Sequence, residues 1–203
     1  MSDRSEPGVA AIVLAAGAST RFGSQKLLAL LDGAPLVRWA AIAAAHSLAA
    51  DVVVVLAPGA TELSDALEGL PVRCVVAADS RSGMSASLRA GLDALEPGIG
   101  AAVIILGDQP MVSVAAIDAL IGAYVNGGAT IAQPLYANGE RGHPVLFSSE
   151  LFGELRGVGG DRGGRDVIAR TPHRVTLVTL DLAAPHDIDT MADFDTLRNA
   201  ARE

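Results

Sequence analysis

Two positively charged residues lie close together in a segment of small residues near the start of the chain. The segment reads LAAGASTRFGSQK over residues 14–26 and follows an apolar run that is typical of a strand. Small residues allow backbone N–H groups to approach an anion closely, and Arg21 and Lys26 bring positive charge to the same place. Because the whole chain has a formal net charge of −8, this local positive charge is unusual. It predicts a turn that binds a polyphosphate.

The spacing of this segment excludes two common phosphate-binding motifs. A P-loop requires G-x-x-x-x-G-K-[ST], whereas here five residues separate Gly17 from Gly23 and two more precede Lys26. The dinucleotide-binding fingerprint G-x-G-x-x-G does not follow this strand either. The segment therefore points to a different class of phosphate site.

A carboxylate directly follows another apolar run. That run ends at Leu106, and Gly107 and Asp108 come next. Hard cations prefer oxygen ligands, and Mg²⁺ often takes one or two carboxylates together with substrate phosphates. Taken alone, Asp108 fits a structural role in a turn or at a helix start as well as it fits the role of a metal ligand. Taken with the cations of the first segment, it predicts a metal ligand.

A third group of acidic residues precedes the expected C-terminal helix. Thr190 and Asp193 have the spacing of a capping-box variant, which accounts for both residues structurally. That account does not cover Asp187 and Asp189, which alternate just before the cap. Either of these two side chains is suited to bring a second carboxylate to the metal ion.

Short apolar runs alternate with helical patterns, which predicts parallel strands joined by helical crossovers. The expected strands are Ala11–Ala15, Val52–Ala57, Val72–Ala77, Ala102–Leu106, Thr130–Pro134, Pro144–Phe147 and Arg174–Leu180. The expected helices are Pro35–Leu48, Glu62–Leu70, Ser85–Leu95, Val114–Val125 and Thr190–Ala201. Nearly continuous apolarity suits strands that helices cover on both faces. We expect one three-layer α/β domain over residues 1–203, with a mostly parallel central sheet and a flexible segment at residues 1–8.

The connections change in character along the chain. After Leu106 they become hairpin-like, and such a switch places ligands at the carboxyl ends of the strands. The glycine-rich segment Gly157–Arg165 is predicted to be a mobile surface loop rather than a domain boundary.

The composition argues against several classes of protein. A net charge of −8 and a pI near 4.9 argue against a general binder of nucleic acids or anionic membranes. No apolar stretch reaches the ~18 residues of a membrane span, and no cationic flank marks a signal peptide. Cys74 is the only cysteine, and its apolar strand predicts a small core residue rather than a disulfide. These features favour a cytoplasmic location.

The order of the motifs resembles that of the molybdenum-cofactor cytidylyltransferases and related nucleotidyltransferases. In this family the first strand runs into L-A-[AG]-G-x-[SA]-x-R-x-G-x-x-K, and residues 14–26 fill every defined position. The further motifs are GMSASL at 83–88, GDQP at 107–110, RGHPVLF at 141–147, GDRGGR at 160–165 and DIDT at 187–190. The resemblance covers most of the chain and implies a Rossmann-like nucleotidyltransferase fold.

The resemblance also implies a reaction and the residues that perform it. The reaction is an Mg²⁺-dependent transfer of CMP from CTP to the phosphate of molybdopterin, with release of pyrophosphate. The implied catalytic residues are Arg21, Lys26 and Asp108, and the implied metal ligands are Asp108 and Asp189, with Asp187 as the alternative to Asp189. The implied nucleotide-binding residues are Leu14, Ala15, Ala16, Gly17, Ser19, Arg21, Lys26, Gly83, Ser87 and Gly107. The implied acceptor-binding residues are Gly142, His143, Arg162 and Arg165.

Two departures from the family patterns bear on these expectations. Ala16 stands where the guanylyltransferase branch typically has glycine, which favours CTP over GTP. Met191 replaces the proline that usually follows the threonine of the last motif, and we expect this change to affect only the entry into the helix. A molybdenum hydroxylase is the protein partner that the resemblance implies.

Structural and functional alternatives stay open at this point. Ser85 or Ser87 is also suited to cap a helix, and Arg162 and Arg165 also fit solvated charges. His143 fits a hydrogen-bond donor to the acceptor or a loop anchor better than a general base. The enzyme could transfer another nucleotide, or use a sugar phosphate or a phospholactate as acceptor. The chain could also be a non-catalytic chaperone that delivers the cofactor, or a binding module for an apo-oxidoreductase.

Overall fold

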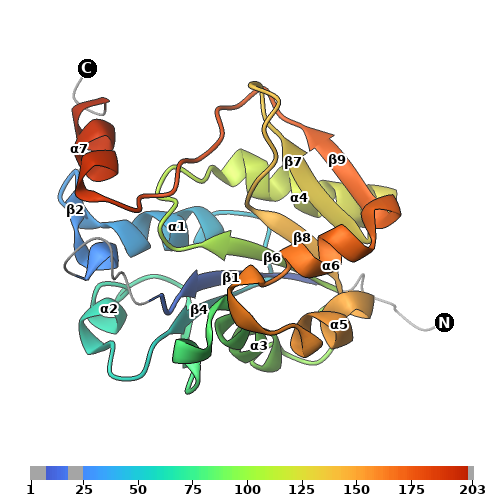
Figure 1. The fold of residues 1–203 in the computed structure, drawn as a ribbon, viewed down its shortest axis with the longest axis horizontal. Helices are drawn as coiled ribbons and strands as arrows, with labels where there is room; N and C mark the ends of the chain where they lie inside the picture. The colour runs from blue at the N-terminus through green and yellow to red at the C-terminus, as the bar shows by residue number, and fades with distance from the viewer. Residues whose placement is uncertain (1–7, 18–24, 201–203) are drawn as a thin grey trace.

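A seven-stranded sheet forms the centre of the molecule, whose computed structural model describes residues 8–17 and 25–200 (Figure 1). The strands are β1 (Val9–Ala15), β4 (Asp51–Leu56), β5 (Arg73–Val76), β6 (Ala101–Leu106), β7 (Ile131–Leu135), β8 (Val145–Ser148) and β9 (Val175–Thr179). Their spatial order is β5-β4-β1-β6-β8-β7-β9, and each overlaps one of the predicted strands. Residues 1–7 of the segment 1–8 that was predicted to be flexible lie outside the described part of the chain.

The sheet is mostly parallel, which confirms the predicted fold class. β1 pairs in parallel with β4 and β6, and β4 pairs in parallel with β5. β8 runs antiparallel to both β6 and β7, whereas β9 is parallel to β7. Leu14 of β1 is in register with Leu106 of β6. The residues that follow these two strands therefore emerge side by side at one edge of the sheet.

Helices cover both faces of this sheet, as its apolar strands require. The helices α1 (Leu36–Ala45), α2 (Thr61–Asp65) and α4 (Val114–Gly127) pack on one face. The helices α3 (Met84–Asp93), α5 (Phe152–Gly157) and α6 (Arg165–Arg170) pack on the other. Alternate residues of β1 enter the two cores: Val13 belongs to the first and Ile12 to the second. The molecule thus has the expected three layers.

Glycine and cap residues set the boundaries of these helices. A Cβ atom on Gly91 would lie 2.5 Å from Cγ2 of Ile12, so α3 approaches β1 more closely than a side chain would allow. The Ser113 side chain accepts a hydrogen bond from the Ala116 N–H and caps the start of α4. Gly128 ends α4 with a φ of 63°, a left-handed conformation that glycine adopts without strain.

The C-terminal helix α7 (Met191–Ala200) lies beside a short hairpin from the start of the chain (Figure 1). The hairpin consists of β2 (Leu30–Leu31) and β3 (Ala34–Pro35). Leu31, Leu36, Ile188 and Phe194 form a separate buried cluster between these elements. Trp39 packs against this cluster and donates a hydrogen bond from Nε1 to the Leu31 carbonyl. These contacts hold the C-terminal helix against the hairpin and the start of α1.

Three sequence expectations differ from the structure. Cys74 was expected in the core, but it is exposed because β5 is an edge strand with largely exposed side chains. The helices α5 and α6 were not expected, and the second begins at Arg165, the last residue of the predicted loop. The predicted helix Glu62–Leu70 forms a regular helix only up to Asp65. Among the described helices, none is both long and apolar enough to cross a membrane.

Short 3-10 helices supply the remaining local structure. They are η1 (Lys26–Leu28), η2 (Ser80–Ser82), η3 (Ser149–Leu151), η4 (Gly160–Arg162) and η5 (Pro172–Arg174). Of these, η1 and η4 contain predicted site residues. They lie at the edge of the sheet to which β1 and β6 lead.

Candidate active site

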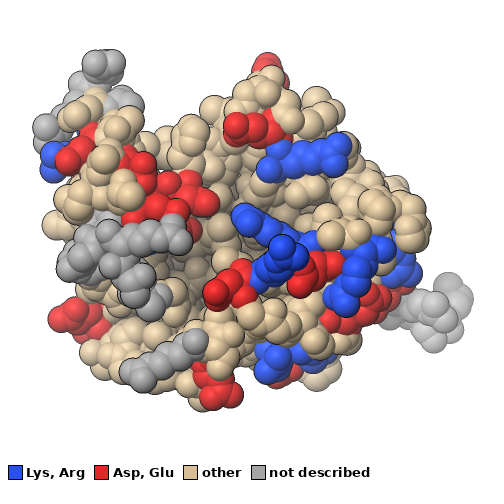
Figure 2. Space-filling model, in the orientation of Figure 1, with Lys and Arg blue, Asp and Glu red and all other residues tan. Residues whose placement is uncertain are grey.

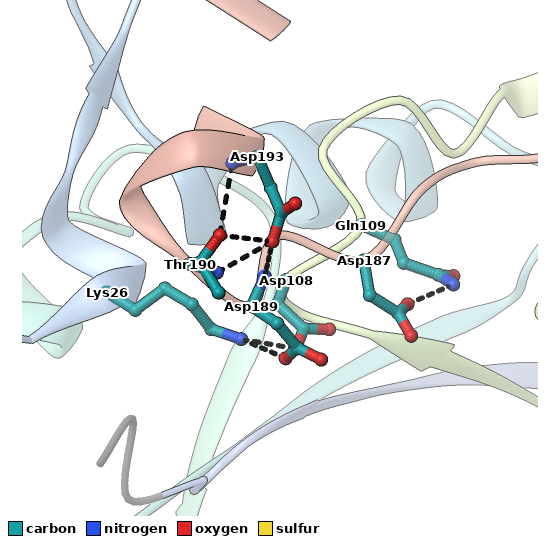
Figure 3. A network of polar contacts seen from close by, with 7 residues as sticks. All are labelled: Lys26, Asp108, Gln109, Asp187, Asp189, Thr190 and Asp193. Atoms are coloured by element: carbon teal, nitrogen blue, oxygen red, sulfur yellow. Dashed lines mark hydrogen bonds and ion pairs between the residues drawn. The ribbon is translucent and has the colours of Figure 1, made fainter. Parts of the chain in front are cut away.

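A buried lysine joins two carboxylates that come from distant parts of the chain (Figure 3). The Nζ atom of Lys26 donates a hydrogen bond to Oδ2 of Asp108 at 2.7 Å. The same atom lies 3.4 Å from Oδ1 of Asp189. The Lys26 side chain is only 9% exposed, whereas that of Asp189 is 52% exposed. Three residues predicted for catalysis and metal binding therefore meet at one point.

Backbone contacts explain why these three residues meet. The Gly107 N–H donates to the Leu14 carbonyl, which fixes the end of β6 against the end of β1. A Cβ atom on Gly107 would lie 3.0 Å from the Leu14 oxygen, so a glycine suits this close approach. The Ile188 N–H donates to the Asp108 carbonyl at 3.1 Å. This last bond ties the C-terminal segment to β6 and holds Asp189 beside Asp108.

A capping box orients the turn that carries Asp189. Oδ2 of Asp193 accepts hydrogen bonds from the Thr190 N–H at 2.7 Å, from the Thr190 hydroxyl at 2.9 Å and from the Asp189 N–H at 3.1 Å. In return, the Thr190 Oγ1 accepts a bond from the Asp193 N–H. These bonds, the Thr190 hydroxyl first, lower the pKa of Asp193. The predicted capping box of Thr190 and Asp193 is confirmed.

Asp187 has a different partner. Its Oδ1 accepts a hydrogen bond of 2.7 Å from Nε2 of Gln109, a side chain that is only 6% exposed (Figure 3). The other amide atom of Gln109, Oε1, has no partner among the described residues. Gln109 belongs to the motif GDQP at residues 107–110, and the sequence alone predicts no role for it. Its position directly after Asp108 is the signal that would have indicated one.

These residues border a cavity of about 490 Å³ at the carboxyl ends of β1 and β6. Its lining includes six of the predicted nucleotide-binding residues: Leu14, Ala16, Gly17, Lys26, Gly83 and Ser87. Asp108, Asp187, Asp189 and Arg165 also line it. Ala15 and Gly107, which were predicted as binding residues, are buried against each other and do not line it. Ser19 and Arg21 lie outside the described residues.

A second, smaller cavity of about 190 Å³ adjoins the first. The two cavities share Leu14, Met84 and Arg165. All four predicted acceptor-binding residues line the smaller one: Gly142, His143, Arg162 and Arg165. Gln133 and Arg141 line it as well, although the sequence had not singled them out for a role. Its floor is apolar and includes Val145 and Phe147 of β8.

Opposite charges face each other across this region. Figure 2 shows a group of Asp and Glu side chains on one side of a hollow and, on the other, Lys and Arg side chains mixed with further acidic ones. The residues that line the two cavities agree with this division, since Asp187 and Asp189 border the larger cavity, while Arg141 and Arg162 border the smaller one. Arg165 borders both. The arginines of the smaller cavity would therefore attract an anionic ligand, whereas the carboxylates of the larger cavity would repel it unless a cation lay between them.

His143 is held in place between two elements of the sheet. Its Nδ1 lies 3.3 Å from the Ile104 carbonyl oxygen, and its own carbonyl accepts a hydrogen bond of 2.6 Å from the Tyr136 hydroxyl. Burial lowers the pKa of His143, although the bond to Ile104 opposes this effect. The imidazole is therefore neutral at neutral pH. Burial also raises the pKa of Tyr136 to about 12.

Within the described residues, no group of three or more His, Cys, Asp or Glu side chains is arranged to hold a metal ion. The carboxylates of Asp108 and Asp189 form only a pair. Such a pair is sufficient for Mg²⁺ when substrate phosphates supply the other ligands.

A third cavity of about 600 Å³ lies between α4 and the segment that precedes α7. Its lining is largely apolar and includes Met111, Tyr136 and Leu182. Asp187 borders both this cavity and the 490 Å³ cavity, and the sequence predicted no other site residue here.

Comparison with known proteins agrees with this arrangement. Residues 11–175 match the model of the MobA-like NTP transferase domain. The chain is 33% identical over 201 residues to 2-C-methyl-D-erythritol 4-phosphate cytidylyltransferase of Streptomyces avermitilis, a match that covers 87% of this chain and 80% of that protein. It is 32% identical over 200 residues to nicotine blue oxidoreductase of Paenarthrobacter nicotinovorans, with 94% and 97% covered.

Two mycobacterial crystal structures resemble nearly the whole chain. The Rv0371c homologue from Mycobacterium sp. strain JC1 has a TM-score of 0.87 and 33% identity, and the match covers 96% of each chain. The manganese complex of Rv0371c from Mycobacterium tuberculosis H37Rv has a TM-score of 0.81 and 29% identity, with 95% of this chain and 98% of that chain covered. The family match, the fold and the converging motifs agree: this chain belongs to the MobA-like NTP transferase family and is a nucleotidyltransferase.

Proposed function

We propose that this nucleotidyltransferase transfers CMP from CTP to the phosphate of a molybdopterin-type acceptor and releases pyrophosphate. The observation that carries the proposal is the meeting of Lys26, Asp108 and Asp189 beside a cavity that adjoins a second, arginine-lined cavity. The first cavity would hold the nucleotide and the second the acceptor. Arg165, which borders both, would lie where the two substrates meet.

The donor set suits a divalent metal ion. The oxygen atoms of Asp108 and Asp189 already converge on a single cation, the Lys26 ammonium. Mg²⁺ prefers oxygen ligands and often uses two carboxylates together with phosphates. Asp108 and Asp189 would hold the ion, which would neutralise negative charge on the reacting phosphates. The manganese complex of Rv0371c supports a divalent ion for this chain as well.

The proposed chemistry needs no nucleophile from the protein. An oxygen of the acceptor phosphate attacks the α-phosphorus of CTP, the bond to the bridging oxygen breaks, and pyrophosphate leaves in line. The attacking phosphate is already anionic near neutral pH, so no general base is required. Catalysis then depends on positioning and on charge neutralisation. Lys26, and Arg21 by its place in the motif, would stabilise the departing pyrophosphate.

The position of His143 fits a structural part in this scheme. Its ring is neutral at neutral pH and is held against the Ile104 carbonyl. From this position it lines the proposed acceptor cavity beside Arg141 and Arg165. We assign it the anchoring of the acceptor loop rather than the transfer of a proton.

The preference for CTP rests on a small difference in the cavity wall. Ala16 is 6% exposed and lines the larger cavity. The guanylyltransferase branch of the resembled family has glycine at this place, so the Ala16 methyl group would reduce the space beside the base. The similarity to a relative named as a cytidylyltransferase supports the same choice.

The decisive experiment identifies the product by mass spectrometry after incubation with Mg²⁺, CTP and molybdopterin, with GTP as the competing nucleotide. We expect the cytosine dinucleotide form of the cofactor and one equivalent of pyrophosphate. A guanine dinucleotide product would overturn the base assignment, and turnover only with other phosphorylated acceptors would overturn the acceptor. Binding of CTP without any release of pyrophosphate would favour a non-catalytic delivery protein.

A further inference from the structure

Lys26 is the only lysine in the 203-residue sequence. All the other residues counted as Lys or Arg are arginines. Its side chain is 9% exposed, and its ammonium contacts the carboxylates of both Asp108 and Asp189. The phosphate-binding segment alone would predict a lysine that faces the nucleotide. Here the ammonium instead faces the two carboxylates that suit a metal ion.

The neighbouring acidic residues are bound to other donors. Asp187 accepts a hydrogen bond from Gln109, and Asp193 accepts three from the turn at Thr190. Lys26 therefore compensates the charge of the pair formed by Asp108 and Asp189. A divalent ion held by the same two carboxylates would meet strong repulsion from an ammonium that remained between them. The two cations exclude each other.

We infer that Lys26 is the resident counter-ion of the metal site and is exchanged for the divalent ion when the nucleotide binds. This inference rests on the proposed function, because it takes Asp108 and Asp189 as metal ligands. Before the nucleotide binds, the ammonium keeps the carboxylate pair from binding a metal ion alone. The triphosphate offers the ammonium a new anionic partner, so the nucleotide and the metal favour each other's binding.

Removal of this counter-ion tests the exchange directly. The K26M variant should bind Mn²⁺ in the absence of nucleotide more tightly than the wild type, by at least about fivefold, the lower end of typical coupling between sites. Electron paramagnetic resonance of free Mn²⁺ gives this affinity without any need for catalysis. R165M is the matched control, because it removes one positive charge from the lining of the same cavity without touching the carboxylate pair. We expect R165M to leave the Mn²⁺ affinity within about twofold of the wild type, as for one screened charge in high dielectric.

A measurement on the unaltered protein makes the test independent of variant folding. Because the chain has one lysine, protein labelled with ¹³C-lysine gives a single set of lysine side-chain signals. We expect the Cε signal to shift when Mg²⁺ and CTP are both bound. Retention of its metal-free position in the Mg²⁺–CTP complex would overturn the exchange, as would a K26M affinity for Mn²⁺ no higher than that of the wild type.

The design separates this inference from the proposed function. One outcome is that the wild type binds Mn²⁺ with CTP while K26M, without CTP, binds Mn²⁺ no more tightly than the wild type does. In that case the exchange is wrong and the metal site stands. If the wild type binds no Mn²⁺ even with CTP, the proposed metal site is wrong and the exchange is overturned with it.

Discussion

Four acidic side chains at the active site, those of Asp108, Asp187, Asp189 and Asp193, accept hydrogen bonds from donors of three kinds. Lys26 contacts Asp108 and Asp189, Gln109 donates to Asp187, and the Thr190 turn holds Asp193. This division assigns different tasks to carboxylates that are nearly equivalent in the sequence. Two of them meet a cation, as metal ligands would, one is held by an amide, and one caps a helix.

Substitution of Asp108 and Asp187 should therefore have unequal effects. D108N keeps the shape of the side chain but removes the charge that faces Lys26. We expect its kcat to fall by roughly a hundredfold or more, the scale for loss of one preorganised charge-stabilising group. D187N is the matched control at the same cavity, with an expected loss of less than about tenfold, because its partner is an uncharged amide.

Steady-state kinetics, with folding checked by circular dichroism, decide between the two carboxylates. Turnover of folded D108N near the wild-type rate would contradict its proposed metal role. A larger loss in D187N than in D189N would make Asp187 the second ligand instead.

The buried imidazole of His143 should make stability depend on pH. Burial lowers its pKa from the ordinary value of 6.5, so below pH 6.5 the unfolded chain binds a proton that the folded protein resists. The stability that the neutral His143 ring contributes is fully present above pH 6.5. It is lost as the pH falls toward the pKa of His143 in the folded protein. Urea unfolding between pH 7.5 and 5 should show a steeper loss for the wild type than for H143Q, by at most about 1.4 kcal/mol per pH unit. Parallel curves would contradict this account.

At the scale of elements, the site depends on close contacts between backbone segments. Gly83 directly precedes α3 and has a φ of 99°, and a Cβ atom there would lie 2.7 Å from the Gly160 backbone. The next residue, Met84, packs close to Gly163: a Cβ atom on Gly163 would lie 3.1 Å from the Met84 sulfur atom. The start of α3 and η4 are thus packed together between the two cavities. A change in one element is expected to move the other.

The variant G83A tests this contact. The left-handed φ and the contact with Gly160 should together destabilise the protein by about 1–3 kcal/mol. Displacement of η4 should also raise the KM for the acceptor, because Arg162 of η4 lines the acceptor cavity, and the KM for the nucleotide, because Gly83 and Asp161 line the nucleotide cavity. G153A is the control, since Gly153 lies in the exposed part of α5 with no atom within 4 Å of a new Cβ. It should keep both KM values and gain about 0.5–1 kcal/mol of stability.

Calorimetry and steady-state kinetics of the two glycine variants give these quantities. Unchanged KM values for both substrates in a destabilised G83A protein would mean that the contact is purely structural.

The elements that the sequence predicted well are those with a strong local signal. The strands ending at Ala15 and Leu106 are continuous apolar runs, and the motifs that follow them led directly to Asp108 and Lys26. The signal was weak for α5 and α6, which have six residues each and lie beside glycines. Exposure of Cys74 depends on the absence of a second neighbour for β5, which is a property of the whole sheet. The partner of Lys26 likewise depends on tertiary contacts across 163 residues of sequence.

At the scale of the whole molecule, the site lies where the central sheet meets a segment close to the C-terminal helix. The carboxyl ends of β1 and β6 provide one wall, and the segment before α7 returns to close the other. The return is fixed by the cluster of Leu31, Leu36, Ile188 and Phe194, which is separate from the two main cores. Asp189 is therefore positioned both by this separate cluster and by the hydrogen bond from the Ile188 N–H to the Asp108 carbonyl at the end of β6.

Loss of this packing should affect metal-dependent binding before it affects the sheet. Phe194 is 5% exposed in the small cluster, and F194A would remove most of its apolar contacts. Buried Phe-to-Ala changes cost about 3–5 kcal/mol, and here we expect the loss to appear as local opening of α7. Hydrogen exchange should accelerate in α7 and leave β1 and β6 protected, while Mn²⁺-dependent CTP binding weakens because Asp189 loses its position. M191A is the control, since Met191 is in the same helix but 49% exposed; a uniform rise in exchange across the sheet would show instead that α7 and the core unfold as one unit.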